Sequence, residues 1–281
     1  RSPSTREAYV TLVTTAKYVV GAEVLAKSLR ALNASRPLLA LVDGSLPRGV
    51  HDRLRAAGWR IQDIEHVANN NAAKLRDRPW FETTFSKLHV FGLTAFDKIV
   101  WLDADLLLLE NIDSLFALQV SSDPTHPPFA AASEVFPPDT FNSGVMVIEP
   151  SEALYRSLIE ASSTLQSYDG SDQGFLNQFF NKWWEAPSAN RLPFRYNVPQ
   201  TLALYYPPGW RKLLEDGIAI LHFAGDDSMK PWSFSGVVPP SLASLLALWQ
   251  ALARAPLDAS AETLAAIYAE YLPGGARRGA G

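Results

Sequence analysis

Apolar runs and amphipathic stretches alternate along most of the chain, and the two patterns have different periods. Short β-branched and apolar runs predict buried strands at residues 9–15, 37–43, 59–64, 98–102, 129–132, 144–148 and 218–222. Apolar positions at helical spacing predict helices at residues 21–32, 50–57, 81–91, 151–165 and 171–184. Strands that alternate with helices favour a parallel sheet with right-handed crossovers, so we expect an α/β fold.

The pattern becomes almost entirely helical near the C-terminus. From residue 241 onward, apolar residues recur at helical spacing, and the chain ends in a loose tail at residues 274–281. A length of 281 residues suits one large α/β domain with a helical extension. We therefore expect a domain over residues 1–238 and a C-terminal helical extension over residues 239–281, packed on the same domain.

Composition narrows the classes of partner and chemistry. Hydrophobic residues make up 47% of the chain and charged residues 19%, which is typical of a globular protein. The formal charge of -4 argues against nucleic-acid binding, which needs a basic surface. The absence of cysteine excludes disulfides, a thiolate nucleophile and cysteine metal ligands. No apolar run approaches the roughly 20 residues that span a bilayer, so we expect no membrane span.

Two carboxylates follow the apolar strand predicted at residues 98–102, in the order Asp103-Ala104-Asp105. Ligands of open α/β sheets bind at the carboxyl edge of the strands, where these side chains would lie. Two hard oxygen donors suit a magnesium or manganese ion that holds a diphosphate. Taken alone, the pattern also fits an exposed turn, or a metal-dependent phosphotransferase or nucleotidyltransferase.

A second group of candidate residues follows the strand predicted at residues 218–222. His222 at its end can supply a nitrogen ligand, which favours manganese over magnesium. Gly225 allows a phosphate to approach the backbone closely, and Lys230 can neutralise diphosphate oxygens. Taken singly, His222 also fits a histidine that merely ends a strand, and Lys230 fits a solvated lysine. The case for a site therefore depends on their combination with Asp103 and Asp105.

Five blocks appear in a fixed order along residues 9–232. They are residues 9–15 with Tyr18 and Gly21, residues 85–89, residues 102–105 with 111–116, residues 141–145, and residues 169–174 followed by 222–232. In this order the blocks resemble glycosyltransferase family 8, most closely its glycogenin and galactinol synthase branches. The resemblance implies a single nucleotide-diphospho-sugar transferase domain, with the GT-A, Rossmann-like fold and a mixed, mostly parallel sheet.

The resemblance also implies an activity and a set of site residues. It implies a retaining enzyme that moves a hexose from a UDP-sugar, UDP-glucose or UDP-galactose first, to a hydroxyl acceptor. Asp103, Asp105 and His222 match ligands of Mn²⁺, with Mg²⁺ as the alternative ion. The catalytic matches are Asp172, Gln173 and Lys87. The donor-binding matches are Leu12, Thr14, Tyr18, Lys87, Ala104, Asn142, Ser143, Gly225 and Lys230.

Physical reasoning agrees with this assignment. A divalent metal and a lysine together stabilise the charge of departing uridine diphosphate. The anomeric carbon becomes oxocarbenium-like, so the carboxylate and amide of Asp172 and Gln173 can stabilise it. Residues 169–172 also read as a turn and helix cap, and both readings can hold at once.

Three departures from the glycogenin branch bear on the acceptor and the nucleotide. The spacing from Gly225 to Lys230 is longer by two residues, and Thr15-Ala16 replaces an Asn-Asp-like pair. Counting from residues 195–197, the self-glucosylated tyrosine would fall at Leu204. In an extended segment Tyr205 would point to the opposite face, and Tyr206 to the same face as Leu204. We therefore expect a separate acceptor: a small polyol, a lipid or a glycan.

Two alternatives stay open at this stage. The first is a self-glucosylating primer that uses Tyr205 or Tyr206, and the second is a non-catalytic sugar-nucleotide or glycan-binding module. The resemblance also allows a homodimer. We expect a cytoplasmic protein, and because the chain does not begin with Met we leave open a removed leader or anchor for the Golgi or secretory route.

Overall fold

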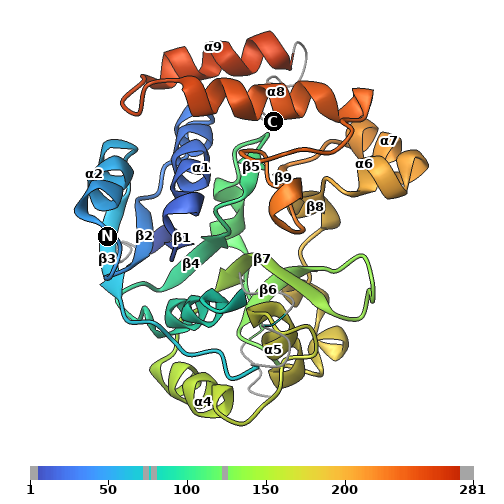
Figure 1. The fold of residues 1–281 in the computed structure, drawn as a ribbon. Coiled ribbons are helices and arrows are strands. Elements are labelled where there is room, and N and C mark those ends of the chain that lie inside the picture. Colours follow the sequence, from blue (N-terminus) through green and yellow to red (C-terminus); the bar gives the residue numbers. More distant parts are fainter. Residues whose placement is uncertain (1–5, 72–75, 77–80, 122–125, 273–281) are drawn as a thin grey trace, which may run out of the picture.

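A mixed sheet runs through the centre of the computed structural model, which describes residues 6–71, 76, 81–121 and 126–272 (Figure 1). Its strand order is β3-β2-β1-β4-β7-β6. The strands are β1 (Glu7–Val13), β2 (Leu38–Asp43), β3 (Arg60–Ile64), β4 (Lys98–Leu102), β6 (Phe129–Ser133) and β7 (Phe141–Ile148). The first four strands pair in parallel, and β7 runs antiparallel to both β4 and β6. The predicted mixed, mostly parallel sheet is confirmed.

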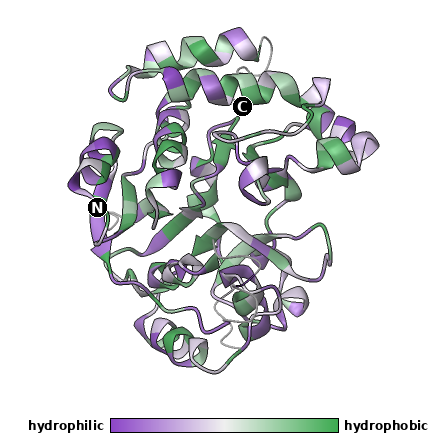
Figure 2. Cartoon of the chain, in the orientation of Figure 1, coloured by the Kyte–Doolittle hydropathy of each residue, from purple (hydrophilic) through white to green (hydrophobic). Residues whose placement is uncertain are grey.

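Both faces of the sheet are covered, because alternate residues of the central strand pack into different clusters. Tyr9 and Val13 of β1 pack on the face that holds α1 (Val19–Ala31) and α2 (Arg48–Ala56). Ala8 and Val10 pack on the other face, with side chains from α4 (Glu152–Ser162) and α5 (Asp172–Phe179). The hydrophilic colour of Figure 2 dominates α2, which turns few side chains toward the core.

A second, smaller sheet lies beyond the carboxyl end of β4. Its order is β5-β9-β8, from β5 (Leu106–Leu108), β9 (Ile220–His222) and β8 (Val198–Pro199). β5 and β9 run antiparallel, and β8 and β9 run parallel. The short helices α6 (Leu202–Tyr205) and α7 (Pro207–Asp216) connect β8 to β9. The segment after Asp103 and the segment before Gly225 are thereby joined by hydrogen bonds.

The C-terminal helices cover one end of the molecule, where α8 (Pro240–Arg254) and α9 (Ala261–Tyr271) lie across α1 (Figure 1). Buried Lys27 of α1 fixes this contact by donating to the carbonyls of Leu252 (2.9 Å) and Ala255 (2.6 Å). A cation suits this position because the C-terminal end of a helix carries partial negative charge. The division at residue 238 stays a prediction, and the predicted tail at residues 274–281 lies outside the described residues. Within the described part, no helix is both long and apolar enough to cross a membrane.

Several predicted elements differ from the structure at their ends or in type. The helix predicted at residues 81–91 is a 3₁₀ helix at Thr84–Gly92, and the helix predicted at 171–184 ends at Phe179. β5, β8, α6 and α7 were not predicted. Two or three residues of strand give no periodic signal. Pro207 and Pro208 lie in the first turn of α7, where the backbone N–H that proline lacks is not needed.

Candidate metal and donor site

The loop between β4 and β5 holds Asp103 and Asp105 in place by backbone pairing on both sides. The N–H of Asp103 donates to the carbonyl of Gly144 (2.9 Å), which continues the pairing of β4 with β7. The carbonyl of Asp105 accepts from the N–H of Phe223 (3.0 Å), next to β9. Gly21 leaves room for this loop, because a Cβ there would lie 2.3 Å from the carbonyl oxygen of Ala104. The two carboxylates are thus positioned by different sheets.

The structure brings the predicted trio Asp103, Asp105 and His222 together. One ligand atom from each lies within 4.8 Å of the others, and Nε2 of His222 is 3.4 Å from Oδ1 of Asp105. Asp105 and His222 are buried, and the side chain of Asp103 is 25% exposed. Two carboxylates and one imidazole form a donor set that suits a divalent ion such as Mn²⁺. The residues present therefore fit the expected metal.

Lys230 lies against the same group of ligands. Its Nζ is 2.5 Å from Oδ2 of Asp105 and donates to the carbonyl of Phe223 (2.9 Å). Burial alone would raise the pKa of Asp105, but Lys230 and His222 outweigh it and hold that pKa well below its usual range. Gly225 has φ +112, a value that favours glycine, and gives the loop its turn before Lys230. Asp105 is therefore a charged, buried candidate for a metal ligand.

Lys87 forms a second charged centre beside the trio. Its Nζ lies 2.6 Å from Oδ2 of Asp172, 3.1 Å from Oδ1 of Asp103 and 3.1 Å from Oγ of Ser143. Burial alone would lower the pKa of Lys87, but Asp103 and Asp172 raise it above its usual value. Burial raises the pKa of Asp103. The charge of Lys87 lowers this pKa, but the charges of Asp105 and Asp172 raise it, and the pKa stays above its usual value. Three carboxylates therefore face two ammonium groups, which favours binding of a further cation.

A row of amides and one acid lies next to Asp172. Gln173 accepts from the N–H of Ser143 (3.3 Å) through Oε1 and donates to Oε2 of Glu134 (3.0 Å). Asn142 donates to the same oxygen of Glu134 (2.9 Å). Asp172 and Gln173 sit at the first turn of α5, where Ser171 caps the helix, as the turn-and-cap interpretation predicted. The site therefore has a polar side that adjoins Asp172 and Ser143.

Sequence reasoning missed Glu134 and Asn197. Glu134 comes directly after β6, and its N–H pairs with the carbonyl of Thr140, so the β6–β7 hairpin turns it toward Gln173. Asn197 precedes β8 and accepts from Nδ1 of His222 (2.8 Å). A polar residue directly after or before a short strand was the available signal, but neither strand pairing could be predicted.

The residues predicted to bind the nucleotide lie around the end of β1. Thr14 shares a hydrogen bond with Thr83 (2.8 Å between the Oγ1 atoms), and half-buried Leu12 packs against the cluster on the α4 face. The ring of Tyr18 meets Trp232 edge to face, with centroids 5.0 Å apart. Burial raises the pKa of Tyr18, and the charge of Asp105 adds to this effect. The end of β1 therefore faces the loop that carries Lys230.

The segment in which the self-glucosylated tyrosine of a glycogenin would fall is helical, so the extended geometry used to weigh Tyr205 and Tyr206 was wrong. α6 spans Leu202–Tyr205, and α7 begins at Pro207. The N–H groups of Tyr205 and Tyr206 donate to the carbonyls of Thr201 and Leu202, so an alternation of faces does not apply. The side chains of Tyr205 and Tyr206 are 76% and 59% exposed. Neither ring is held in the core.

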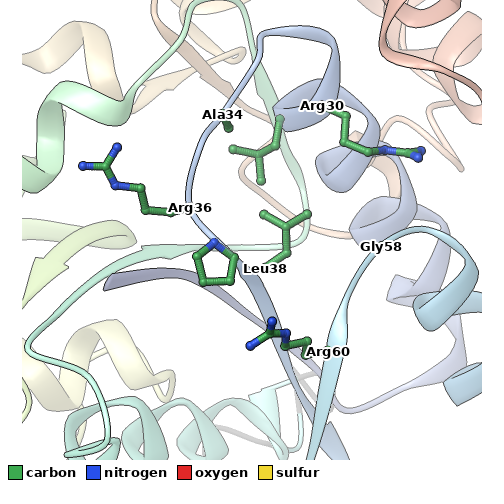
Figure 3. Close-up of a pocket in the computed structure, with 8 residues that line it drawn as sticks. Arg30, Ala34, Arg36, Leu38, Gly58 and Arg60 are labelled. Atoms are coloured by element: carbon green, nitrogen blue, oxygen red, sulfur yellow. The ribbon is translucent and has the colours of Figure 1, made fainter. Parts of the chain in front are cut away.

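A surface pocket of about 330 Å³ lies at the opposite edge of the main sheet, where β2 and β3 begin (Figure 3). Arg36 at its wall pairs with Glu7 (2.9 Å), and Arg30 donates to the carbonyl of Leu257 (2.7 Å). Figure 3 shows the two guanidinium groups pointing in opposite directions. The pocket holds none of the predicted site residues, and we assign it no part in the chemistry.

Comparison with known proteins agrees with this geometry. Residues 9–236 match the model of Glycosyl transferase family 8. The chain is 39% identical to glycogenin-1 of Caenorhabditis elegans over 234 residues, which covers 83% of this chain and 52% of that protein. It is 39% identical to UDP-glucuronate:xylan alpha-glucuronosyltransferase 1 of Arabidopsis thaliana, over 81% of this chain and 32% of that protein. This chain thus spans about half of the first relative and a third of the second.

Solved structures show the same fold at lower identity. The glycosyltransferase GlyE of Streptococcus pneumoniae superposes with a TM-score of 0.66 at 21% identity, over 97% of this chain and 64% of that one. This likeness, together with the mixed sheet and its covering helices, confirms the predicted GT-A fold.

Proposed function

Because this chain belongs to Glycosyl transferase family 8, we propose that it moves a hexose from a UDP-sugar to a hydroxyl group of a separate acceptor. In this proposal the reaction retains the anomeric configuration and requires a divalent ion, Mn²⁺ ahead of Mg²⁺. The observation that carries it is the convergence of Asp103, Asp105 and His222 within 4.8 Å, beside Lys87 and Asp172. UDP-glucose and UDP-galactose are the donors we propose first.

The leaving group determines what the cationic side of the site does. Asp103, Asp105 and His222 would hold the ion, which supplies Lewis-acid stabilisation to the departing diphosphate. Lys230 lies 2.5 Å from Asp105 and can reach the same phosphate oxygens as a fixed positive charge. Gly225 has a positive φ and no Cβ, so it would allow a phosphate to approach the backbone. These residues stabilise charge that develops as the sugar–phosphate bond breaks.

The polar side of the site would act on the sugar. Asp172 pairs with Lys87 at 2.6 Å and is buried, so this ion pair acts at close range. Gln173 sits beside it with its amide fixed by Ser143 and Glu134. A carboxylate and an amide oxygen held in this way can stabilise an oxocarbenium-like anomeric carbon. Lys87 pairs with both Asp103 and Asp172, so it would connect the residues that hold the metal with those that act on the sugar.

Self-glucosylation is the second candidate, and two observations favour it. The worm relative is a glycogenin, and Tyr205 and Tyr206 are largely exposed. Leu204 argues against it, because this residue occupies the position of the self-glucosylated tyrosine and has no hydroxyl group. We therefore place a separate polyol, lipid or glycan acceptor first. A non-catalytic sugar-nucleotide module is the third candidate, and a cytoplasmic location and a homodimer are further proposals from the family resemblance.

Release of UDP tests the proposal directly. The protein would be incubated with UDP-glucose, UDP-galactose, UDP-xylose and UDP-glucuronate, with Mn²⁺ or with EDTA, and with and without polyol and glycan acceptors. We expect Mn²⁺-dependent release that one donor supports best and an acceptor increases. UDP that binds with no release from any donor would favour the binding module. Release that EDTA leaves unchanged would contradict the metal proposal.

A further inference from the structure

The two ring nitrogens of His222 face different partners. Nδ1 lies 2.8 Å from Oδ1 of Asn197, and Nε2 lies 3.4 Å from Oδ1 of Asp105. A neutral imidazole carries its proton on one nitrogen, and the hydrogen bond made at the other nitrogen selects which one. A metal ligand must present a lone pair. The partner on Nδ1 therefore decides whether Nε2 can serve as a ligand.

A chain of hydrogen bonds that begins at a backbone N–H fixes the direction of the bond to Nδ1. The N–H of Gly144 can only donate, and it lies 2.9 Å from Oδ1 of Asn142. The other end of that amide, Nδ2, lies 2.9 Å from the carboxylate of Glu134, which can only accept while it is ionised. Both contacts agree on one orientation of the Asn142 amide.

The same argument carries over to the next amide. Oδ1 of Asn142 also lies 2.8 Å from Asn197, and since this oxygen accepts, the group that faces it is Nδ2 of Asn197. Oδ1 of Asn197 is then the atom that faces His222, and an amide oxygen can only accept. Nδ1 of His222 must therefore carry a proton, and the neutral ring presents its lone pair at Nε2, toward Asp105.

Packing leaves the ring little freedom to escape this arrangement. Asn197 and His222 are both buried, at 2% and 6% exposed. Parallel pairing of β8 with β9 holds Pro199 beside His222 and so keeps Asn197 within reach. A Cβ on Gly144 would lie 2.5 Å from Cε1 of His222, so the ring edge rests directly on this glycine. Gly144 thus supplies both the first donor and the space for the ring.

We propose that Asn197 is a positioning residue that fixes the Nδ1–H tautomer of His222 and so prepares Nε2 to bind the metal. The proposal rests on the proposed metal site, and it gives Asn142 a task besides any contact with the sugar. Outer partners of metal-bound histidines commonly change metal affinity by about 10–100-fold when removed. Here the outer partner is an amide whose own direction is set by Glu134 and Gly144 through Asn142.

The test reads the tautomer without metal and the metal affinity separately. Protein labelled with ¹⁵N-histidine would be studied by long-range ¹H–¹⁵N NMR at a pH where the rings are neutral, with His222 assigned from its absence in His222→Asn. The variants are Asn197→Ala, which removes the acceptor, and Asn197→Asp, which retains one. Asn190→Ala is the matched control, since buried Asn190 donates to the carbonyls of Pro127 and Phe129 and touches no site residue. Mn²⁺ affinity would be measured by electron paramagnetic resonance.

We expect wild-type His222 to carry its proton on Nδ1. Asn197→Ala should populate the Nε2–H form and weaken Mn²⁺ binding by about 10–100-fold, while Asn197→Asp keeps the Nδ1–H form and Asn190→Ala changes neither. An Nε2–H wild type, or an Asn197→Ala variant with unchanged tautomer and unchanged Mn²⁺ affinity, would overturn the inference. A wild type with the Nδ1–H ring that binds no Mn²⁺ would instead contradict the proposed metal dependence.

Discussion

The ammonium group of Lys230 lies 2.5 Å from a carboxylate oxygen of Asp105, across 125 residues of sequence. The same carboxylate belongs to the candidate metal trio, so Lys230 is held where metal and diphosphate would meet. Lys87 contacts another member of the trio, Asp103, and pairs with Asp172 at 2.6 Å. In the proposed function the two lysines would divide the site into a diphosphate side and a sugar side, and this division can be tested.

Lys230→Ala and Asp172→Asn should separate donor binding from chemistry. Loss of Lys230 removes a charge-assisted contact of about 1.5–3 kcal/mol, so affinity for UDP should fall roughly 10–100-fold. Asp172→Asn should lower turnover and leave UDP affinity nearly unchanged, because the proposal places Asp172 next to the sugar. Calorimetric titration of UDP with Mn²⁺, together with initial rates, checks both. Equal losses of UDP affinity in the two variants would refute the division.

Asp105→Asn should abolish Mn²⁺ binding and transfer while the protein stays folded. The change removes one charged ligand but keeps the side-chain shape between β4 and β5. Since loss of an outer partner costs about 10–100-fold in metal affinity, loss of a ligand should cost more. The control is Asp97→Asn, an exposed acid that pairs with Arg6 away from the site. Near-normal activity of Asp105→Asn at saturating Mn²⁺ would show that the ligand is wrongly assigned.

Gly144→Ala should weaken metal binding through His222. The new methyl group would lie 2.5 Å from Cε1 of that ring, so the ring has to move. We expect a loss of about 10–100-fold in Mn²⁺ affinity, measured by paramagnetic resonance. Gly44→Ala provides the comparison, because its nearest neighbour would be the carbonyl oxygen of Ile64 at 3.8 Å. Equal Mn²⁺ affinity in the two variants would mean that the ring tolerates displacement.

Asp113 should contribute stability that acid removes. It accepts from the hydroxyls of Tyr9 and Ser35, both at 2.7 Å. Burial alone would raise its pKa, but these bonds and that of the Ser35 N–H hold the pKa below its usual value. Because the pKa is lower in the folded protein, Asp113 contributes its full stabilisation at pH values above the unfolded pKa of about 3.9. This stabilisation is lost as the pH falls through the folded pKa.

Urea unfolding of Asp113→Asn measures this effect. At pH 7 we expect a loss of about 1 kcal/mol, allowing for partial exposure, and the difference from wild type should shrink below about pH 4. Asp139→Asn, at an exposed acid in the β6–β7 loop, should change stability little at any of these pH values. A difference that stays constant into strong acid would show that the carboxylate charge is not involved.

Intact-mass measurement decides between a separate acceptor and self-glucosylation. After incubation with UDP-glucose and Mn²⁺, we expect an unchanged protein mass, because Leu204 occupies the position of the self-glucosylated tyrosine. The exposed Tyr205 and Tyr206 provide the counter-test. Successive additions of one hexose, lost in the Tyr205→Phe/Tyr206→Phe double variant, would establish a primer. Additions that persist in that variant would place the acceptor elsewhere on the chain.

The parts of the site that sequence reasoning predicted are those with a local signal. Asp103 and Asp105 follow a strand that is apolar from Ile99 to Leu102, and His222 ends another apolar strand, so each residue marks the end of a strand. Glu134 and Asn197 also stand next to strands, but their places in the site follow from the turn of the β6–β7 hairpin and the pairing of a two-residue strand, which the sequence did not predict. The helices within residues 202–216 were not predicted, because proline usually argues against a helix. Here the prolines lie at the start of α7, where they are favourable.

Insertions and deletions should be tolerated very unevenly around this centre. In the small sheet, His222 pairs with Leu106 on one side and Pro199 on the other. A shift of one residue in any of these three strands would turn a strand-borne side chain to the opposite face. Residues 226–229 lie beyond the sheet in a short 3₁₀ turn, which pairs with no strand. Variation in chain length between Gly225 and Lys230, such as the longer spacing seen in this sequence, therefore leaves the pairing around His222 untouched.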